Sequence, residues 1–201
     1  MPDVGAAAAD PQRSHVRWVI LALLFGASFV AYVLRTNMSI AGESIMDDLG
    51  LTKIQLGLVF SAFAWGYAIF QFPGGVFGDI VGSRRALSFI AVWWGVLTVA
   101  TGLVPGTARA STTFILAVLI GLRFLIGVAQ APLFPVFGGG TIGKWFPVSG
   151  WAFPNGLTST GLTLGAAVTA PLVAWLMQRL GWRESFIVTA PLAFLIGGVW
   201  W

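Results

Sequence analysis

The sequence predicts an all-α membrane protein with six transmembrane helices, and three observations carry this prediction. First, 57% of the residues are hydrophobic and only 9% are charged, whereas soluble domains carry about 25% charged residues. Second, six apolar segments meet or approach the roughly 20 residues that a helix needs to cross a hydrocarbon core of about 30 Å. Third, several tryptophans lie near the ends of these segments, as interfacial anchors do: Trp18, Trp145, Trp182, Trp200 and Trp201.

The six segments follow one another along the chain as residues 17–41, 52–77, 86–105, 112–138, 150–178 and 184–201. Residues 1–14 are expected to form a disordered cytoplasmic tail, and residues 15–201 a single six-helix bundle. Arg13 and Arg17 ahead of an apolar run also resemble a secretory signal peptide. However, the first run is longer than a signal-peptide core and five more segments follow it. A retained first helix is therefore preferred.

The connection 42–51 carries three acids, Glu43, Asp47 and Asp48. We expect it to be a solvated outer loop, and a funnel for cations is the alternative. An N-terminus inside the cell would place five Lys and Arg residues in the cytoplasm and four outside, which is a weak positive-inside bias. The inside group is Arg13, Arg17, Arg84, Arg85 and Lys144, and the outside group is Lys53, Arg109, Arg179 and Arg183.

Proline and glycine mark the later segments. Pro132 and Pro135 in the fourth segment and Pro171 in the fifth remove backbone donors, so they should bend or loosen those helices. Gly161 and Gly165 are one helical turn apart, and small residues at this spacing allow the backbones of two membrane helices to approach closely.

Several function classes are excluded by composition. The absence of Cys rules out disulfides, thiolate metal sites and cysteine nucleophiles, and the one histidine, His15, cannot form a histidine cluster. No segment presents a nucleophile–base pair, so neither an enzyme nor a bound cofactor or metal is expected. The 11 Lys and Arg residues form no basic stripe, so nucleic-acid binding is not expected either.

Two arginines lie inside predicted membrane segments, Arg35 in the first and Arg123 in the fourth. A charge at the centre of a membrane helix costs about 2.5–3.5 kcal/mol on insertion scales, which is usually offset by a water-filled cavity, a counter-charge or a ligand. No acid lies within the segments to neutralise them, apart from Glu184 at the very start of the sixth. A positive cavity without a carboxylate suits a substrate that carries negative charge. The alternative, strongest for Arg35, is that the side chain extends to the membrane interface.

Polar side chains spaced by three, four or seven residues extend this candidate site, because such residues share a helical face. Each pair alone is more often an interhelical hydrogen bond than a ligand contact. Together, from four segments, they are interpreted as a cavity lining for substrate binding. The set comprises Tyr32, Arg35 and Ser39; Tyr67 and Gln71; Arg123 and Gln130; and Asn155 with Ser159.

A charged turn separates the second and third segments. Gly75 and Gly78 permit close helix contact, and Gly82 permits a tight turn. Arg84 and Arg85 would anchor this end among anionic headgroups. Asp79 ends the second helix, where the helix dipole disfavours an acid, so it should need a partner that either arginine can supply. The turn could also be a topological anchor without a gating role.

This pattern, G-x-x-x-D-x-x-G-x-R-R, resembles the loop between helices 2 and 3 of major facilitator superfamily transporters. The resemblance implies the N-terminal half of a twelve-helix fold, with six helices arranged as two inverted three-helix repeats. It also implies that Asp79 belongs to a cytoplasmic gating contact between the two halves. The first and fourth helices become counterparts, and each carries one of the two membrane arginines.

Further stretches resemble the anion:cation symporter branch, which includes bacterial sugar-acid permeases. They are Tyr32-x-x-Arg35-x-Asn37-x-Ser39, Ala64-Trp65-Gly66-Tyr67, Arg123-x-x-x-Gly127, Lys144-Trp145-Phe146-Pro147, Asn155-Gly156 and Gly181-Trp182-Arg183. The resemblance implies carboxylate binding by Arg35 and Arg123, and proton coupling through nearby acids. Leu34 and Gln130 stand where such acids occur, and neither can titrate, so a coupling acid would have to come from elsewhere.

The expected function is therefore secondary active transport of small organic anions, such as sugar acids or aromatic acids, across a bacterial inner membrane. The partners would be the anion, the lipid bilayer and the missing C-terminal half. A transporter of neutral or cationic compounds is an alternative, but it would require an acid in the cavity. Because only one half is present, a truncated, non-transporting fragment is a second alternative, and it is preferred over a dimerising half-transporter.

Overall fold

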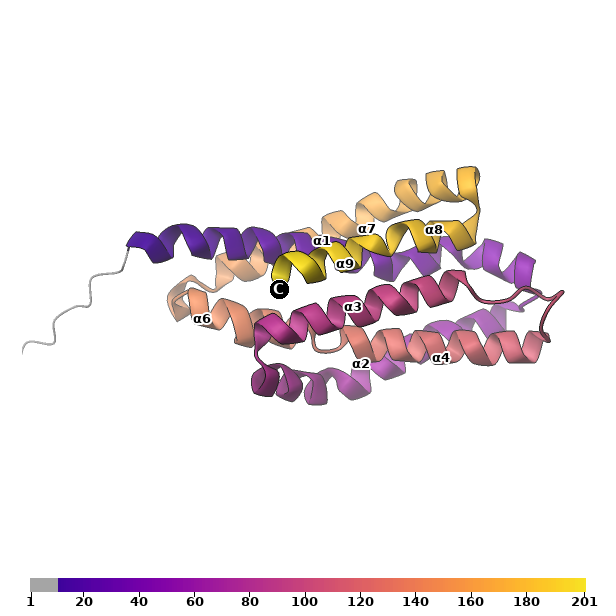
Figure 1. Ribbon diagram of the computed structural model, residues 1–201, viewed down its shortest axis with the longest axis horizontal. Coiled ribbons are helices and arrows are strands. Elements are labelled where there is room, and N and C mark those ends of the chain that lie inside the picture. Colours follow the sequence, from indigo (N-terminus) through magenta and orange to yellow (C-terminus); the bar gives the residue numbers. More distant parts are fainter. Residues whose placement is uncertain (1–10) are drawn as a thin grey trace, which may run out of the picture.

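The computed structural model describes residues 11–201, with side chains from His15 onward, and all of its regular elements are helical (Figure 1). The long helices are α1 (Pro11–Leu49), α2 (Lys53–Val81), α3 (Ser83–Gly102), α4 (Thr112–Gln130) and α7 (Ala152–Leu180). The shorter ones are α5 (Leu133–Pro135), η1 (Val136–Ile142), α6 (Gly143–Trp145), η2 (Val148–Gly150), α8 (Trp182–Thr189) and α9 (Pro191–Trp200). The all-α prediction is confirmed.

The predicted tail falls mainly outside this description. Residues 1–10 lie outside the described residues, and the prediction for them stays a prediction. Residues 11–14 already belong to α1.

Five helical segments of the described chain are long and apolar enough to cross a membrane: His15–Leu49, Lys53–Val81, Ser83–Gly102, Thr112–Trp145 and Val148–Leu180. The sixth predicted segment forms α8 and α9, which are separated by Ala190 ahead of Pro191. Ala190 keeps helical backbone angles and its N–H bonds to the carbonyl of Phe186, so the chain continues in the same direction. Proline interrupts this last segment because it supplies no backbone N–H.

The predicted outer loop at 42–51 is wrong for most of its length. Helix α1 continues to Leu49, and the chain turns only at Gly50, which has a φ of 62°. Ala41, Ile45 and Leu49 are fully buried and recur every four residues. This apolar stripe continues the helix past the acids, of which Glu43 and Asp47 are exposed and Asp48 contacts α8.

Prolines act differently in the fourth and fifth segments. Helix α4 ends at Gln130, just before Pro132, and the chain continues through α5 into the π-helical η1. The expected loosening is therefore present there. In contrast, α7 is continuous through Pro171.

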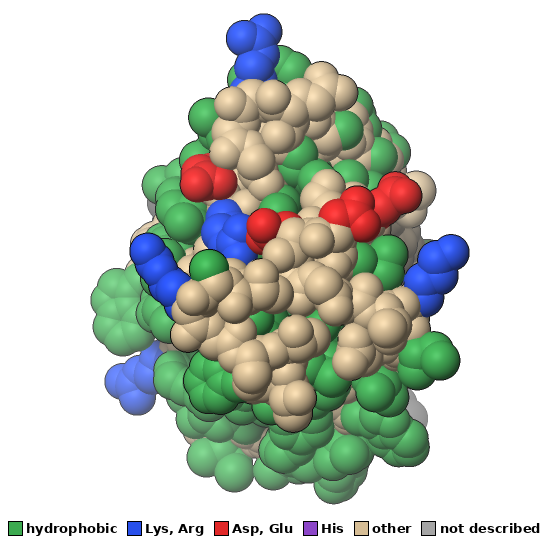
Figure 2. Space-filling model, turned by 90° about the vertical axis from the view of Figure 1, so that its right-hand side faces the viewer, with side chains coloured by type: hydrophobic (Ala, Val, Ile, Leu, Met, Phe, Trp, Pro, Cys, Tyr) green, Lys and Arg blue, Asp and Glu red, His purple; other side chains and the backbone are tan. Residues whose placement is uncertain are grey.

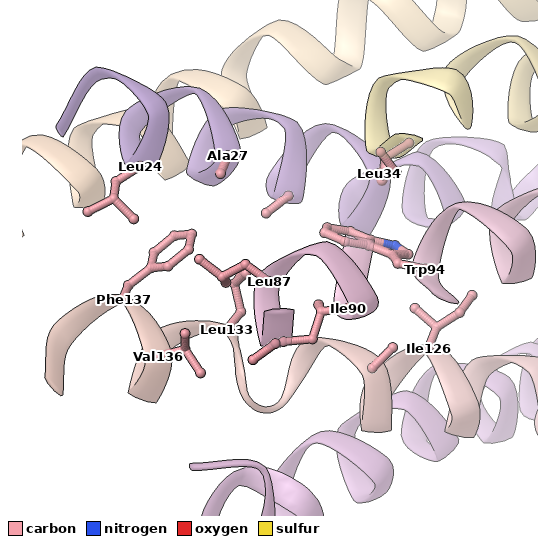
Figure 3. Packing of buried hydrophobic residues seen from close by; sticks show 14 of the residues in the cluster. Leu24, Ala27, Leu34, Leu87, Ile90, Trp94, Ile126, Leu133, Val136 and Phe137 are labelled. Atoms are coloured by element: carbon pink, nitrogen blue, oxygen red, sulfur yellow. The ribbon is translucent and has the colours of Figure 1, made fainter. Parts of the chain in front are cut away.

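Each long helix has a main neighbour: α1 lies beside α7, α2 beside α4, and α3 beside the shorter α9 (Figure 1). Gly161 and Gly165 permit the first pairing, because a Cβ on either would overlap the backbone carbonyl of Phe25 or Phe29 on α1. This confirms the predicted close approach. Between the pairs lies an apolar core formed by α1, α3 and the α4–η1 segment (Figure 3). Its labelled members include Leu24, Leu87, Trp94, Ile126 and Phe137.

The bundle has two ends that matter for function. The amino-terminal end contains the start of α1, the α2–α3 turn, α6 and the end of α9 (Figure 1). The opposite end contains the end of α1 and the start of α8, where acidic side chains gather (Figure 2). There Asp48 accepts hydrogen bonds from the Trp182 indole, at 3.1 Å, and from the Arg183 guanidinium, with which it forms an ion pair.

Candidate functional site

Arg35 lies on α1 within a cage of three aromatic rings. The central carbon of its guanidinium is 4.9 Å from the Phe63 ring centroid, 5.2 Å from that of Tyr67 and 5.4 Å from that of Tyr32. The side chain is half-buried, and no carboxylate of the described residues lies within ion-pair distance of it. Aromatic faces stabilise a guanidinium and leave its N–H donors available to an acceptor.

Tyr67 and Gln71 continue this cluster along α2. The Gln71 amide donates a hydrogen bond to the Tyr67 hydroxyl at 3.3 Å. The structure therefore brings together Tyr32, Arg35, Tyr67 and Gln71, which the sequence placed on two separate helices. Phe63 was not among the predicted residues. Its position one turn before Tyr67, on the same face of α2, is the signal that could have identified it.

The cage depends on close packing of α2 against α4. Gly66 and Gly127 face each other, and a Cβ on Gly66 would overlap the carbonyl of Phe124. A Cβ on Gly127 would lie 2.8 Å from the Tyr67 backbone nitrogen and would overlap the carbonyl of Phe63. The backbones that carry two of the cage rings thus rest directly on α4.

Arg123 and Gln130 do not face an open surface, in contrast to the expected cavity lining. Each is only 3% exposed. Arg123 lies on the buried stripe of α4 that begins with Ile115 and Leu119, because all three are spaced by four residues. Its central carbon is 6.0 Å from the Phe186 ring centroid on α8.

Both residues keep donors without partners in the described part of the chain. These are Nε and Nη2 of Arg123 and Nε2 of Gln130. Buried donors without partners are costly, so an acceptor that reaches Arg123 would gain strong, charge-assisted hydrogen bonds.

Asn37 is a further buried polar residue near these elements. Its amide donates to the Thr189 hydroxyl at 3.0 Å and links α1 to α8, while its carbonyl oxygen has no partner among the described residues. Ser39 and Asn155 are exposed and make no hydrogen bond to the Arg35 cage. The Asn155 amide instead donates to the Trp151 carbonyl on its own segment, at 2.8 Å.

The α2–α3 turn has the predicted backbone but not the predicted ion pair. Gly82 has a φ of 85°, and a Cβ on Gly75 would touch Pro135 at 3.3 Å. Asp79 is exposed and forms no ion pair with Arg84 or Arg85, whose side chains are also exposed. The expected partner within the turn is therefore wrong.

The reason lies in the geometry at the two helix ends. Asp79 lines a hollow on α2 with Gln71 and Pro135, whereas Arg84 and Arg85 line a different cavity, beyond the turn. The Arg84 guanidinium is 5.9 Å from the ring centroid of Trp201.

Comparison with known proteins assigns the family. The profile of the Major Facilitator Superfamily matches residues 23–201. The chain belongs to the major facilitator superfamily. It is similar to a probable galactarate/D-glucarate transporter, GudP, of Bacillus subtilis, with 34% identity over 94% of this chain and 41% of that protein. It is also similar to a D-galactonate transporter of Escherichia coli, with 37% identity over 98% of this chain and 43% of that protein.

A probable sulfoacetate transporter, SauU, of Cupriavidus necator is 40% identical over 88% of this chain and 39% of its own length. Among solved structures, a bacterial homolog of the human lysosomal transporter Spinster superposes with a TM-score of 0.71 and 22% identity, covering 96% of this chain and 43% of that one. This likeness shows the fold. The chain spans less than half the length of these relatives, and it matches a half of the superfamily fold. It is an integral, multi-pass membrane protein.

Proposed function

We propose that this chain is the N-terminal half of a secondary transporter of small organic anions, with Arg35 as a primary anion contact. The observation that carries this proposal is the aromatic cage. It surrounds the guanidinium of Arg35, which is a residue of a membrane-spanning helix, and leaves this side chain partly accessible. No carboxylate of the described residues forms an ion pair with it. A carboxylate or sulfonate on a substrate would supply the missing negative charge. Similar proteins named as transporters of galactarate, galactonate and sulfoacetate support this substrate class.

Arg123 supplies the second cationic contact in this proposal. It lies one turn from Gly127, where α4 touches the backbone of Phe63 and Tyr67, and its unpaired donors are buried. An anion held at Arg35 therefore lies next to the helix pair that carries Arg123. A transport cycle that opens this packing would expose Arg123 to the anion, and Gln130 would offer a neutral hydrogen-bond donor.

The membrane orientation and the gating role also belong to this proposal. The amino-terminal end of the bundle would face the cytoplasm of a bacterium, and the end with Asp48 would face outward. Asp79 is exposed and unpaired with the nearby arginines, so it is free to contact a second six-helix half. No enzymatic activity is proposed.

Anion transport by the complete transporter in proteoliposomes tests the proposal. Arg35→Gln should abolish uptake of a sugar acid, because the amide removes the charge. Arg35→Lys should retain partial activity, since an ammonium keeps the charge but lacks the planar donor fork. Arg179→Gln, at an exposed position in the last turn of α7, is the matched control and should transport normally. Unchanged uptake by Arg35→Gln would overturn the assignment.

A further inference from the structure

A cavity at the amino-terminal end of the bundle combines cations with apolar side chains. Its volume is about 570 Å³, within the range of roughly 300–1,000 Å³ that is common for ligand pockets. Its walls come from α1, the α2–α3 turn, the η1–α6 segment and the end of α9, which lie at the same end of the molecule (Figure 1). It is separate from the Arg35 cage, with which it shares no lining residue.

The charges of this cavity are unbalanced. Arg84, Arg85 and Lys144 line it and are exposed, and no Asp or Glu is among its lining residues. Asp79 lies against a different hollow, on α2. Three cations around one cavity repel each other, so a bound anion would lower the electrostatic energy of the group.

The neutral hydrogen-bonding groups of the cavity hold its walls together. The Ser83 hydroxyl donates to the Gly140 carbonyl at 2.6 Å, and the Thr141 hydroxyl donates to the Val136 carbonyl at 3.0 Å. The first bond ties the start of α3 to η1. The cations and the indole N–H groups of Trp145 and Trp200 therefore remain as side-chain donors for a ligand, on a scaffold that is fixed by backbone contacts.

The apolar and aromatic residues that also line the cavity favour a lipid over a free ion as its ligand. Ile20 and Leu23 of α1 contribute apolar surface, and Trp145 and Trp200 contribute indole rings of the kind enriched at membrane interfaces. A free phosphate ion would use the cations and indole N–H groups but not the apolar wall. A phospholipid would place its phosphate on the cations and its glycerol and first methylenes on the apolar wall.

We propose that this cavity binds the headgroup phosphate of an anionic phospholipid at the membrane surface. Basic pockets between membrane helices are suited to such headgroups, and each basic residue contributes roughly fivefold in affinity. The bound lipid would bridge the α2–α3 turn to α6 and α9. Free inorganic phosphate shares the phosphate chemistry and is separated from a lipid by the experiment.

Lipid binding is measured by native mass spectrometry on the purified 201-residue chain in a neutral detergent, with phosphatidylglycerol or phosphatidylcholine as the probe. Phosphatidylglycerol should bind at least about fivefold more tightly than phosphatidylcholine. Lys144→Gln should weaken its binding roughly fivefold, and Lys144→Gln with Arg85→Gln roughly 25-fold. Lys53→Gln and Arg179→Gln, at exposed positions of the opposite end, are the matched controls and should change binding less than twofold.

Three results would overturn the proposal. The first is equal binding of the two lipids, and the second is an equal loss in the control variants. The third is displacement of phosphatidylglycerol by low millimolar inorganic phosphate, which would assign the cavity to a free ion. Circular dichroism of each variant confirms that the helices are retained, so a loss of binding reports on the cavity.

Discussion

Gly127→Ala tests whether the contact between α2 and α4 positions the Arg35 cage. The new Cβ would lie 2.8 Å from the Tyr67 nitrogen and would overlap the Phe63 carbonyl, whereas ordinary contact begins at 3.4 Å. The helices would have to separate by roughly half an ångström or more, and overpacking of this kind costs about 1–3 kcal/mol. The backbones of Phe63 and Tyr67 would move with α2, so anion affinity should fall together with stability.

Gly121→Ala on the same helix is the matched control, because a Cβ there has no neighbour within 4 Å. Both substitutions gain about 0.5–1 kcal/mol from the higher helix propensity of Ala, so their difference isolates the overpacking cost. Thermal unfolding followed by the fluorescence of the ten tryptophans measures this difference. Equal stability of the two variants would refute the reasoning, because it would show that α2 and α4 do not touch at this position.

Three further predictions concern other parts of the bundle. Arg123→Leu should raise the free energy of unfolding by up to about 3 kcal/mol, because it removes a buried charge with unpaired donors. The same substitution should abolish anion transport. A loss of stability in thermal unfolding would contradict this reasoning. Gly82→Ala should cost about 1–2 kcal/mol because of the φ of 85°, whereas Gly57→Ala, in open space, should not destabilise the chain. Asp48→Asn should cost less than about 1 kcal/mol, and its coupling to Arg183→Gln in a double-mutant cycle should weaken with added salt; a salt-independent coupling would be inconsistent with a half-exposed pair.

The part of the site that could be predicted from the sequence depends on spacing within one helix. Tyr32 and Arg35 share a face of α1, and Tyr67 and Gln71 share a face of α2, and the structure keeps each pair in contact. Spacing within one helix could not predict that these two pairs lie next to each other. This arrangement depends on how α1 and α2 are placed relative to each other, and the position of α2 follows in part from its close packing on α4 at Gly66 and Gly127, which lie on separate helices.

Where the prediction from the sequence differed from the structure, the repeat of buried residues along a helix decided the outcome. Three acids indicated a loop after residue 41, but the buried Ile45 and Leu49 carry α1 onward. Arg123 was expected in a cavity because of its charge, but it follows the apolar register of its helix. In both cases the repeat of buried residues was the stronger signal, since burial of one helical stripe stabilises many residues together and a single charge opposes it only locally.

The most direct test of the central claim is the equilibrium affinity of the complete transporter for a sugar acid and for the corresponding neutral sugar alcohol. These ligands differ mainly in the carboxylate that Arg35 is proposed to bind. A charge-assisted hydrogen bond is worth about 1.5–3 kcal/mol, so the acid should bind at least about tenfold more tightly. This preference should disappear in Arg35→Gln. Equal affinity for the two ligands in the unmodified protein would contradict the assignment of the caged arginine as an anion site.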